Sequence, residues 1–251
     1  RAGFVAALLS VGMAASAATP PAPTRAGTPN VIIILADDLG YGDLGSYGGK
    51  RIRTPNLDRL AAEGMRFTSF YAQPVCGPSR AALMTGSYPL RVAKRKNVVE
   101  HHPRLHAQEI TIAEILKTRG YATAAFGKWD LAGHSQNAAQ YESDLLPTHQ
   151  GFDEYFRGEM RQYLASHDLQ GKPFADAPHV VADNRFRVVV QTEAALSFLD
   201  RRAAKPEQPF FLYLAWYAPH VPLESPEPWF SKTPTELPKE RRQALAMLAA
   251  M

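Results

Sequence analysis

The chain has 251 residues, of which 45% are hydrophobic and 21% are charged, and its formal net charge is +4. These values are typical of one sizeable globular domain with a real core, and the single cysteine excludes an internal disulfide. The charge excess is too small to indicate a nucleic-acid partner, and we expect none.

Residues 1–18 are predicted to be a secretory signal peptide. A basic residue precedes a short apolar run, and Ala15-Ser16-Ala17 forms an A-x-A cleavage site. The absence of an initiator Met indicates a clipped start; the alternative reading is a buried N-terminal helix. The apolar run is too short to span a membrane, so no transmembrane anchor is expected. After a linker at 19–28, export with one cysteine predicts a periplasmic or secreted enzyme.

After the linker, predicted strands alternate with predicted helices. The continuous β-branched run at 30–38 is typical of a strand that is buried on both faces of a parallel sheet. A glycine-rich loop follows, and then a helix that opens at Thr54-Pro55 and a strand at 65–73. A short helix comes next, with Pro78 in its first turn.

The second half of the chain continues this alternation. Helices are predicted at 108–120 and 184–202, and strands at 121–126 and 209–220. This order predicts an α/β fold in which helices cover both sides of a mostly parallel sheet, which is a three-layer α/β/α sandwich. Residues 29–251 are expected to form one domain.

Polar residues follow the ends of four predicted strands: Asp37 with Asp38, then Cys76, Lys128 and His220. Because ligands of such folds bind beyond the carboxyl ends of the strands, these side chains are expected to form one site. Adjacent carboxylates repel each other unless a cation neutralises them, and their hard oxygen ligands suit Ca²⁺ or Mg²⁺. The alternative for the acid pair is a solvated loop.

Cys76 is expected just before a helix N-terminus, where the helix dipole lowers the pKa of a thiol. Arg80 adds a positive charge within one turn. The alternative for this cysteine is a small buried hydrophobe. Lys128 and His220 can bind an oxyanion and protonate a leaving group. Together with the acid pair, these groups predict the hydrolysis of a sulfate or phosphate ester.

The segment CGPSRAALMTG resembles the C-x-P-S-R-x-x-x-[LM]-T-G signature of the type I sulfatases and fits every fixed position. The segments PNVIIILADDLGYGDLGSYG, GYATAAFGKW and PFFLYLAWYAPHVPL resemble further parts of this family, which belongs to the alkaline phosphatase superfamily, and the chain looks arylsulfatase-like. In that family a maturase, the formylglycine-generating enzyme, converts the cysteine into formylglycine. The hydrated aldehyde of that residue is the nucleophile.

The resemblance implies a role for each residue of the predicted site. The acid pair would bind Ca²⁺ beside Cys76, which as formylglycine would attack sulfur. Arg80 would hold the hydrated aldehyde. Lys128 would bind a sulfate oxygen, and His220 would bind sulfate and help the leaving group to depart.

Two features depart from the family pattern. The family reads G-K-W-H, but this chain has Asp130 in place of the histidine that is thought to assist breakdown of the sulfated intermediate. A carboxylate cannot donate a proton as imidazolium does, so a shifted pH profile or substrate class is expected, unless His134 takes that place. The family's later Asp-Asn metal ligands do not follow His220, and the dipeptide Asp183-Asn184 precedes the last strand.

The sequence therefore predicts an exported sulfatase that cleaves sulfate esters, with sulfated polysaccharide as a candidate substrate. Residues 29–251 are expected to be the N-terminal portion of its catalytic domain, incomplete at the C-terminal end and inactive alone. Two alternatives stay open: a phosphate or phosphonate ester hydrolase of the same superfamily, and a pseudoenzyme that binds sulfated glycans. Specificity is expected in loops at 91–107 and 134–145, and the basic stretch at 90–106 either attracts an anionic polymer or is a solvated loop.

Overall fold

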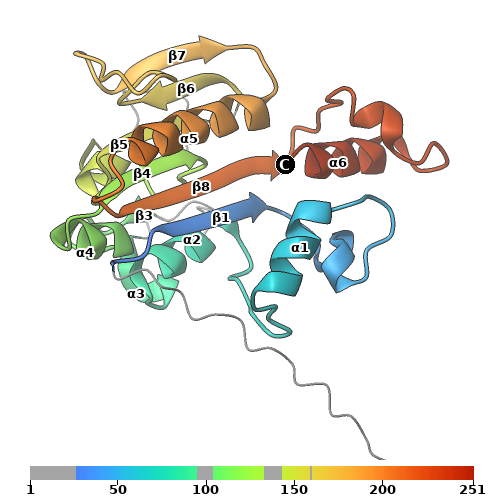
Figure 1. Cartoon of the computed structure of the whole chain (residues 1–251), viewed down its shortest axis with the longest axis horizontal. Helices are drawn as coiled ribbons and strands as arrows, with labels where there is room; N and C mark the ends of the chain where they lie inside the picture. Colours follow the sequence, from blue (N-terminus) through green and yellow to red (C-terminus); the bar gives the residue numbers. More distant parts are fainter. Residues whose placement is uncertain (1–26, 95–103, 133–142, 159) are drawn as a thin grey trace, which may run out of the picture.

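A computed structural model describes residues 27–94, 104–132, 143–158 and 160–251 (Figure 1). The predicted signal peptide, most of the predicted linker and His134 lie outside these residues. Among the described helices, none is long and apolar enough to cross a membrane.

In the described residues, a six-stranded sheet has the order β1-β8-β4-β5-β6-β7 (Figure 1). The first four strands of this order run parallel, and the last two are antiparallel to their neighbours. The strands are β1 (Val31–Asp37), β4 (Ala122–Gly127), β5 (Glu154–Gly158), β6 (Arg161–Ala165), β7 (His179–Asp183) and β8 (Phe210–Pro219). The predicted mostly parallel sheet is confirmed.

Helices cover both faces of this sheet. The long helix α5 (Arg187–Ala203) packs on one face, while α2 (Cys76–Thr85) and α4 (Ile112–Thr118) pack on the other. Each face has its own apolar core, so the three-layer prediction is confirmed. The remaining elements are α1 (Pro55–Glu63), α3 (Pro89–Val92), α6 (Lys239–Ala250), a two-stranded sheet of β2 (Ala93–Lys94) with β3 (Arg104–Leu105), and the 3-10 turns η1 (Tyr41–Asp43), η2 (Gly45–Tyr47), η4 (Ser143–Leu145), η5 (Pro147–His149) and η6 (Phe230–Lys232).

The strand β8 lies between β1 and β4 and joins the two cores. Phe211 and Tyr213 pack into the core under α2 and α4, while Leu212 and Leu214 pack under α5. Because both faces of β8 are covered, its sequence is a continuous apolar run without polar alternation.

Helix ends follow the signals in the sequence. Thr111 caps α4 by accepting a hydrogen bond from the backbone N–H of Glu114, whose carboxylate accepts one from the N–H of Thr111. Gly86 ends α2 in the left-handed conformation, with φ +66°.

Two expectations about strands are wrong. Residues 65–73 form no strand, and the aromatic rings of Phe70 and Tyr71 are exposed, because no described backbone pairs with this segment. The strand β1 is not buried on both faces. Its Ile33 and Leu35 pack into a core, but Ile32 and Ile34 are about half exposed (47% and 53%), since α5 lies over β8 and β4 instead.

Gly127 lets β4 end close against β8. Its φ is +94°, and a Cβ atom there would lie 2.0 Å from the carbonyl oxygen of Ala215. The backbone N–H of Lys128 donates to that same oxygen at 2.7 Å. This close approach fixes the position from which the Lys128 side chain extends beyond the sheet.

The substitution Gly127→Ala is expected to destabilise the fold more than Gly120→Ala. Both glycines have positive φ, but a Cβ at Gly120 meets no atom within 4 Å. Gly120→Ala therefore measures backbone strain alone, about 1–2 kcal/mol, whereas Gly127→Ala also forces β8 to move. Urea unfolding followed by circular dichroism measures both losses, and equal losses would show that the approach of β4 to β8 is not tight.

Candidate active site

The carboxyl ends of β1, β4 and β8 meet at one edge of the sheet, next to the start of α2 (Figure 1). Asp37 ends β1, Cys76 begins α2, Lys128 follows β4 and His220 follows β8. One ligand atom each of Asp37, Cys76 and His220 lies within 4.8 Å of the others. The structure thus brings the predicted strand-end residues together, while their chemical roles stay predictions.

A β-bulge sets the place of Asp37. The register pairs Ala36 with Trp216, but then pairs Asp37 with Pro219, so β8 carries extra residues at this point. Bulges of this kind redirect a side chain at the end of a pairing. The Asp37 carboxylate is buried here, with 5% exposure.

Two buried cations share the Asp37 carboxylate. Arg80 donates to its Oδ1 at 3.2 Å, and Lys128 donates to its Oδ2 at 2.7 Å. Arg80 also donates to the backbone carbonyl of Lys128 and to the hydroxyl of Tyr213, both at 2.9 Å. Removing the Asp37 carboxylate would take an anionic partner from both buried cations, which is strongly unfavourable.

The surrounding charges keep both cations protonated. Burial disfavours the charge of Lys128, but Asp130 and Asp37 outweigh that cost and raise the pKa of its amine. Burial acts in the same way on Arg80, where Tyr213 and Asp37 outweigh it and raise the pKa of the guanidinium. The site therefore presents fixed positive charge across the neutral pH range.

The prediction of a lowered thiol pKa at Cys76 is wrong. Cys76 is itself the first residue of α2, and its partial burial and the negative charge of Asp37 raise the thiol pKa, which the charge of Lys128 only partly opposes. The helix dipole favours a thiolate, but a neighbouring carboxylate and the loss of water act more strongly against it.

His220 and Asp38 face each other at the rim of the site. The Nδ1–H of His220 donates to the carbonyl of Val221 at 2.6 Å, because a carbonyl only accepts. Its Nε2 is 3.8 Å from Asp38, whose side chain is 62% exposed and whose φ is +66°. Arg187 supports this turn by donating to the carbonyls of His220 (2.5 Å) and Pro222 (2.8 Å).

Sequence reasoning missed three residues of the site. Tyr213 accepts a hydrogen bond from Arg80, and the ring of Tyr217 lies 4.4 Å from the Lys128 amine and 5.1 Å from the Arg187 guanidinium. A tyrosine in a buried strand needs a partner for its hydroxyl, and this requirement was the available signal for Tyr213. For Arg187 we find no signal, since its contacts are distant in sequence.

Asp130, the departure from the family pattern, is also buried in the site. Its Oδ2 lies 3.2 Å from the amine of Lys128, and its φ is +56°. Aspartate adopts this left-handed conformation more readily than most residues do.

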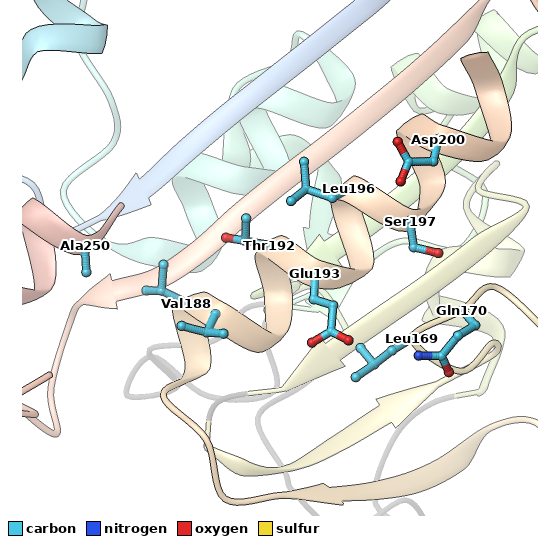
Figure 2. Close-up of a pocket in the computed structure, with 10 residues that line it drawn as sticks. Leu169, Gln170, Val188, Thr192, Glu193, Leu196, Ser197, Asp200 and Ala250 are labelled. Atoms are coloured by element: carbon cyan, nitrogen blue, oxygen red, sulfur yellow. The ribbon is translucent and has the colours of Figure 1, made fainter. Parts of the chain in front are cut away.

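Figure 2 shows a different hollow, an open groove of about 520 Å³ along the solvent-facing side of α5. None of the predicted site residues is among the described residues that line it. They are Leu169, Gln170, Val188, Val189, Thr192, Glu193, Leu196, Ser197, Asp200 and Ala250. The groove is therefore separate from the strand-end site.

The strand-end site has donors that fit a hard divalent cation. Asp37 and Asp38 offer carboxylate oxygens, and the sulfur of Cys76 lies within 4.8 Å of an oxygen of Asp37. Such oxygen donors are the ones that Ca²⁺ and Mg²⁺ prefer. Asp38 lies outside the tight group of Asp37, Cys76 and His220, so it would approach a cation from the exposed side.

The chain is similar in sequence to curated sulfatases and similar in fold to solved structures. N-acetylgalactosamine-6-sulfatase of Canis lupus familiaris is 34% identical over 247 residues, covering 88% of this chain and 44% of that protein. Human arylsulfatase A is 48% identical over 130 residues, covering 51% of this chain and 24% of that protein. The crystal structure of Ps i-CgsB in complex with k-i-k-neocarrahexaose matches with a TM-score of 0.71 and 31% identity, over 88% of this chain and 52% of that one.

The chain spans less than half the length of these two curated relatives. The Sulfatase family pattern matches it over residues 29–249, nearly the whole described part. With the alkaline phosphatase-like fold of its structural neighbours, this match shows that the chain belongs to the sulfatase family.

Proposed function

We propose that the protein hydrolyses sulfate esters, with formylglycine formed from Cys76 as the group that attacks sulfur. The observation that carries this proposal is the grouping of Cys76, Asp37 and His220 within 4.8 Å, next to the buried cations Arg80 and Lys128. Family membership over residues 29–249 supports it. We take these residues as part of a catalytic domain that begins at residue 29.

The unmodified thiol is poorly suited to the reaction. Its raised pKa leaves little thiolate at neutral pH, so a cysteine nucleophile of the usual kind would be weak here. Formylglycine in its hydrated form supplies a hydroxyl nucleophile instead. Production of that group by a maturase is part of the proposal, and Arg80 beside Asp37 would help to hold it.

Lys128 and His220 would bind the sulfate group. The Lys128 amine gives a fixed positive charge to a sulfate oxygen, because two carboxylates raise its pKa. His220 has its Nδ1–H committed to Val221, so its Nε2 faces the site. When protonated, this Nε2 can bind sulfate and give its proton to the leaving alcohol.

Asp37 and Asp38 would hold a divalent cation, which we propose to be Ca²⁺, with Mg²⁺ as the alternative. A bound cation would supply positive charge to the attacking and sulfate oxygens. It would also compensate the acid pair, whose members lie at the end of β1 and at the first residue after it.

The proposed substrates are sulfate esters of sugars, including sulfated polysaccharide. One relative is named for N-acetylgalactosamine 6-sulfate, and a structural neighbour was solved with k-i-k-neocarrahexaose. We further propose that the protein is exported to the periplasm or secreted, on the signal-peptide pattern of residues 1–18. A phosphate or phosphonate ester substrate is not favoured, because the relatives are sulfatases.

Co-expression with a formylglycine-generating maturase is expected to convert Cys76 into an aldehyde. Mass spectrometry of the tryptic peptide Phe67–Arg80 detects this change. Cys76→Ala should abolish hydrolysis of an aryl sulfate, since no other group in the site can replace the nucleophile. Protein made without the maturase is the control. Full activity with an intact thiol in both preparations would contradict the proposal.

Removal of the cation, or of one of its ligands, is expected to suppress hydrolysis. Asp38→Ala in the matured protein should weaken Ca²⁺ binding and lower kcat/KM, because a carboxylate ligand is lost. Asp200→Ala, which removes an exposed carboxylate on α5, is the matched control and should behave like the wild type. Calorimetric titration with Ca²⁺ and aryl sulfate kinetics measure both effects. Undiminished turnover of Asp38→Ala would contradict its role as a ligand, and undiminished turnover of chelated wild type would contradict the need for a cation.

A further inference from the structure

We propose that Asp130 is a positioning residue, a second carboxylate that holds the Lys128 amine in place when Asp37 binds the cation. The inference rests on the proposed function and deepens it. It assigns a role to the position where this chain departs from the G-K-W-H pattern.

The Lys128 amine lies between two buried carboxylates. It is 2.7 Å from Oδ2 of Asp37 and 3.2 Å from Oδ2 of Asp130. The three side chains are at most 5% exposed, so water does little to screen these contacts. A lysine placed in this way has two anionic partners, and only one of them, Asp37, belongs to the group of candidate cation ligands.

Both oxygens of the Asp37 carboxylate already accept from a buried cation. Arg80 occupies Oδ1 and Lys128 occupies Oδ2. A divalent cation that bound the remaining lone pairs of Asp37 would lie close to the Lys128 ammonium group and would repel it. A buried ammonium group without an anionic partner is strongly unfavourable. Asp130 supplies that partner, so Lys128 can stay in the site next to a bound cation.

The same geometry argues against Asp130 as a replacement for the proton-transfer histidine of the family. Its carboxylate is buried to 2% exposure and is engaged with the ammonium group of Lys128. We therefore infer that the Asp130 carboxylate positions the Lys128 amine and does not transfer a proton to the substrate. Restoring the histidine would place a titratable base beside Lys128 and Arg80, where positive charge is already concentrated.

The test compares Asp130→Asn, Asp130→Glu and Asp130→His in the full-length matured protein that carries this chain. Asp144→Asn is the matched control, since Asp144 is exposed and it is its backbone carbonyl that accepts a hydrogen bond from Gln150. Three quantities are measured: Ca²⁺ affinity by calorimetry, inhibition by inorganic sulfate, and kcat and KM on an aryl sulfate. Thermal unfolding is recorded for every variant.

Asp130→Asn is expected to weaken Ca²⁺ binding and sulfate inhibition about 10- to 100-fold, because Lys128 then competes for Asp37. Asp130→Glu, which keeps the charge, should recover much of both. Asp130→His should recover neither, although it restores the family residue. Asp144→Asn should match the wild type.

Several outcomes would overturn the role of Asp130. These are wild-type Ca²⁺ and sulfate constants in Asp130→Asn, a loss of thermal stability alone, equal or higher activity in Asp130→His, or no Ca²⁺ binding by the wild type. Failure of the proposed function is distinguishable from these. In that case the wild type would not hydrolyse aryl sulfate, while its Ca²⁺ affinity would still fall in Asp130→Asn and recover in Asp130→Glu.

Discussion

The organisation of the site depends on one buried carboxylate, that of Asp37, which two cations share. Arg80 comes from α2 and Lys128 from the end of β4, so this single group ties three separate segments together. Ion pairs buried this deeply are not reliable sources of stability, because desolvation offsets much of their attraction. Their contribution here is to position the site, since Arg80 and Lys128 each reach the Asp37 carboxylate from a different segment.

Ordinary packing aligns the strands that carry the site. The strand β8 is covered on both faces and aligns β1 and β4 on either side of it. The bulge at Asp37 then sets the backbone position of that residue, and the close approach at Gly127 sets the backbone position of Lys128. Arg187 donates to the carbonyl of His220 and so supports the turn after β8. Reactive groups mounted on strand ends in this way are placed more accurately than groups on long loops.

The sequence was enough to predict the α/β class and most of the strands and helices that carry the site, because these follow local patterns. Asp37, Cys76, Lys128 and His220 stand directly after strands or at a helix start, and parallel topology brings such positions together. The sequence was not enough to predict properties that depend on contacts between residues far apart in the chain. The thiol pKa of Cys76 depends on its burial and on Asp37 across the site. The exposed segment 65–73 has strand-like residues but no backbone partner among the described residues.

The exposed side of β1 has a consequence for how the protein opens. Among the described strands, β1 pairs only with β8, and Ile32 and Ile34 lack a covering helix. Edge strands with few buried contacts are among the first elements to exchange their amide protons, since their local opening costs little free energy. This edge strand ends in Asp37, so fraying of β1 would pull apart the carboxylate–cation network. A ligand that binds Asp37 is therefore expected to hold this edge strand in place, and amide exchange in β1 reports its occupancy.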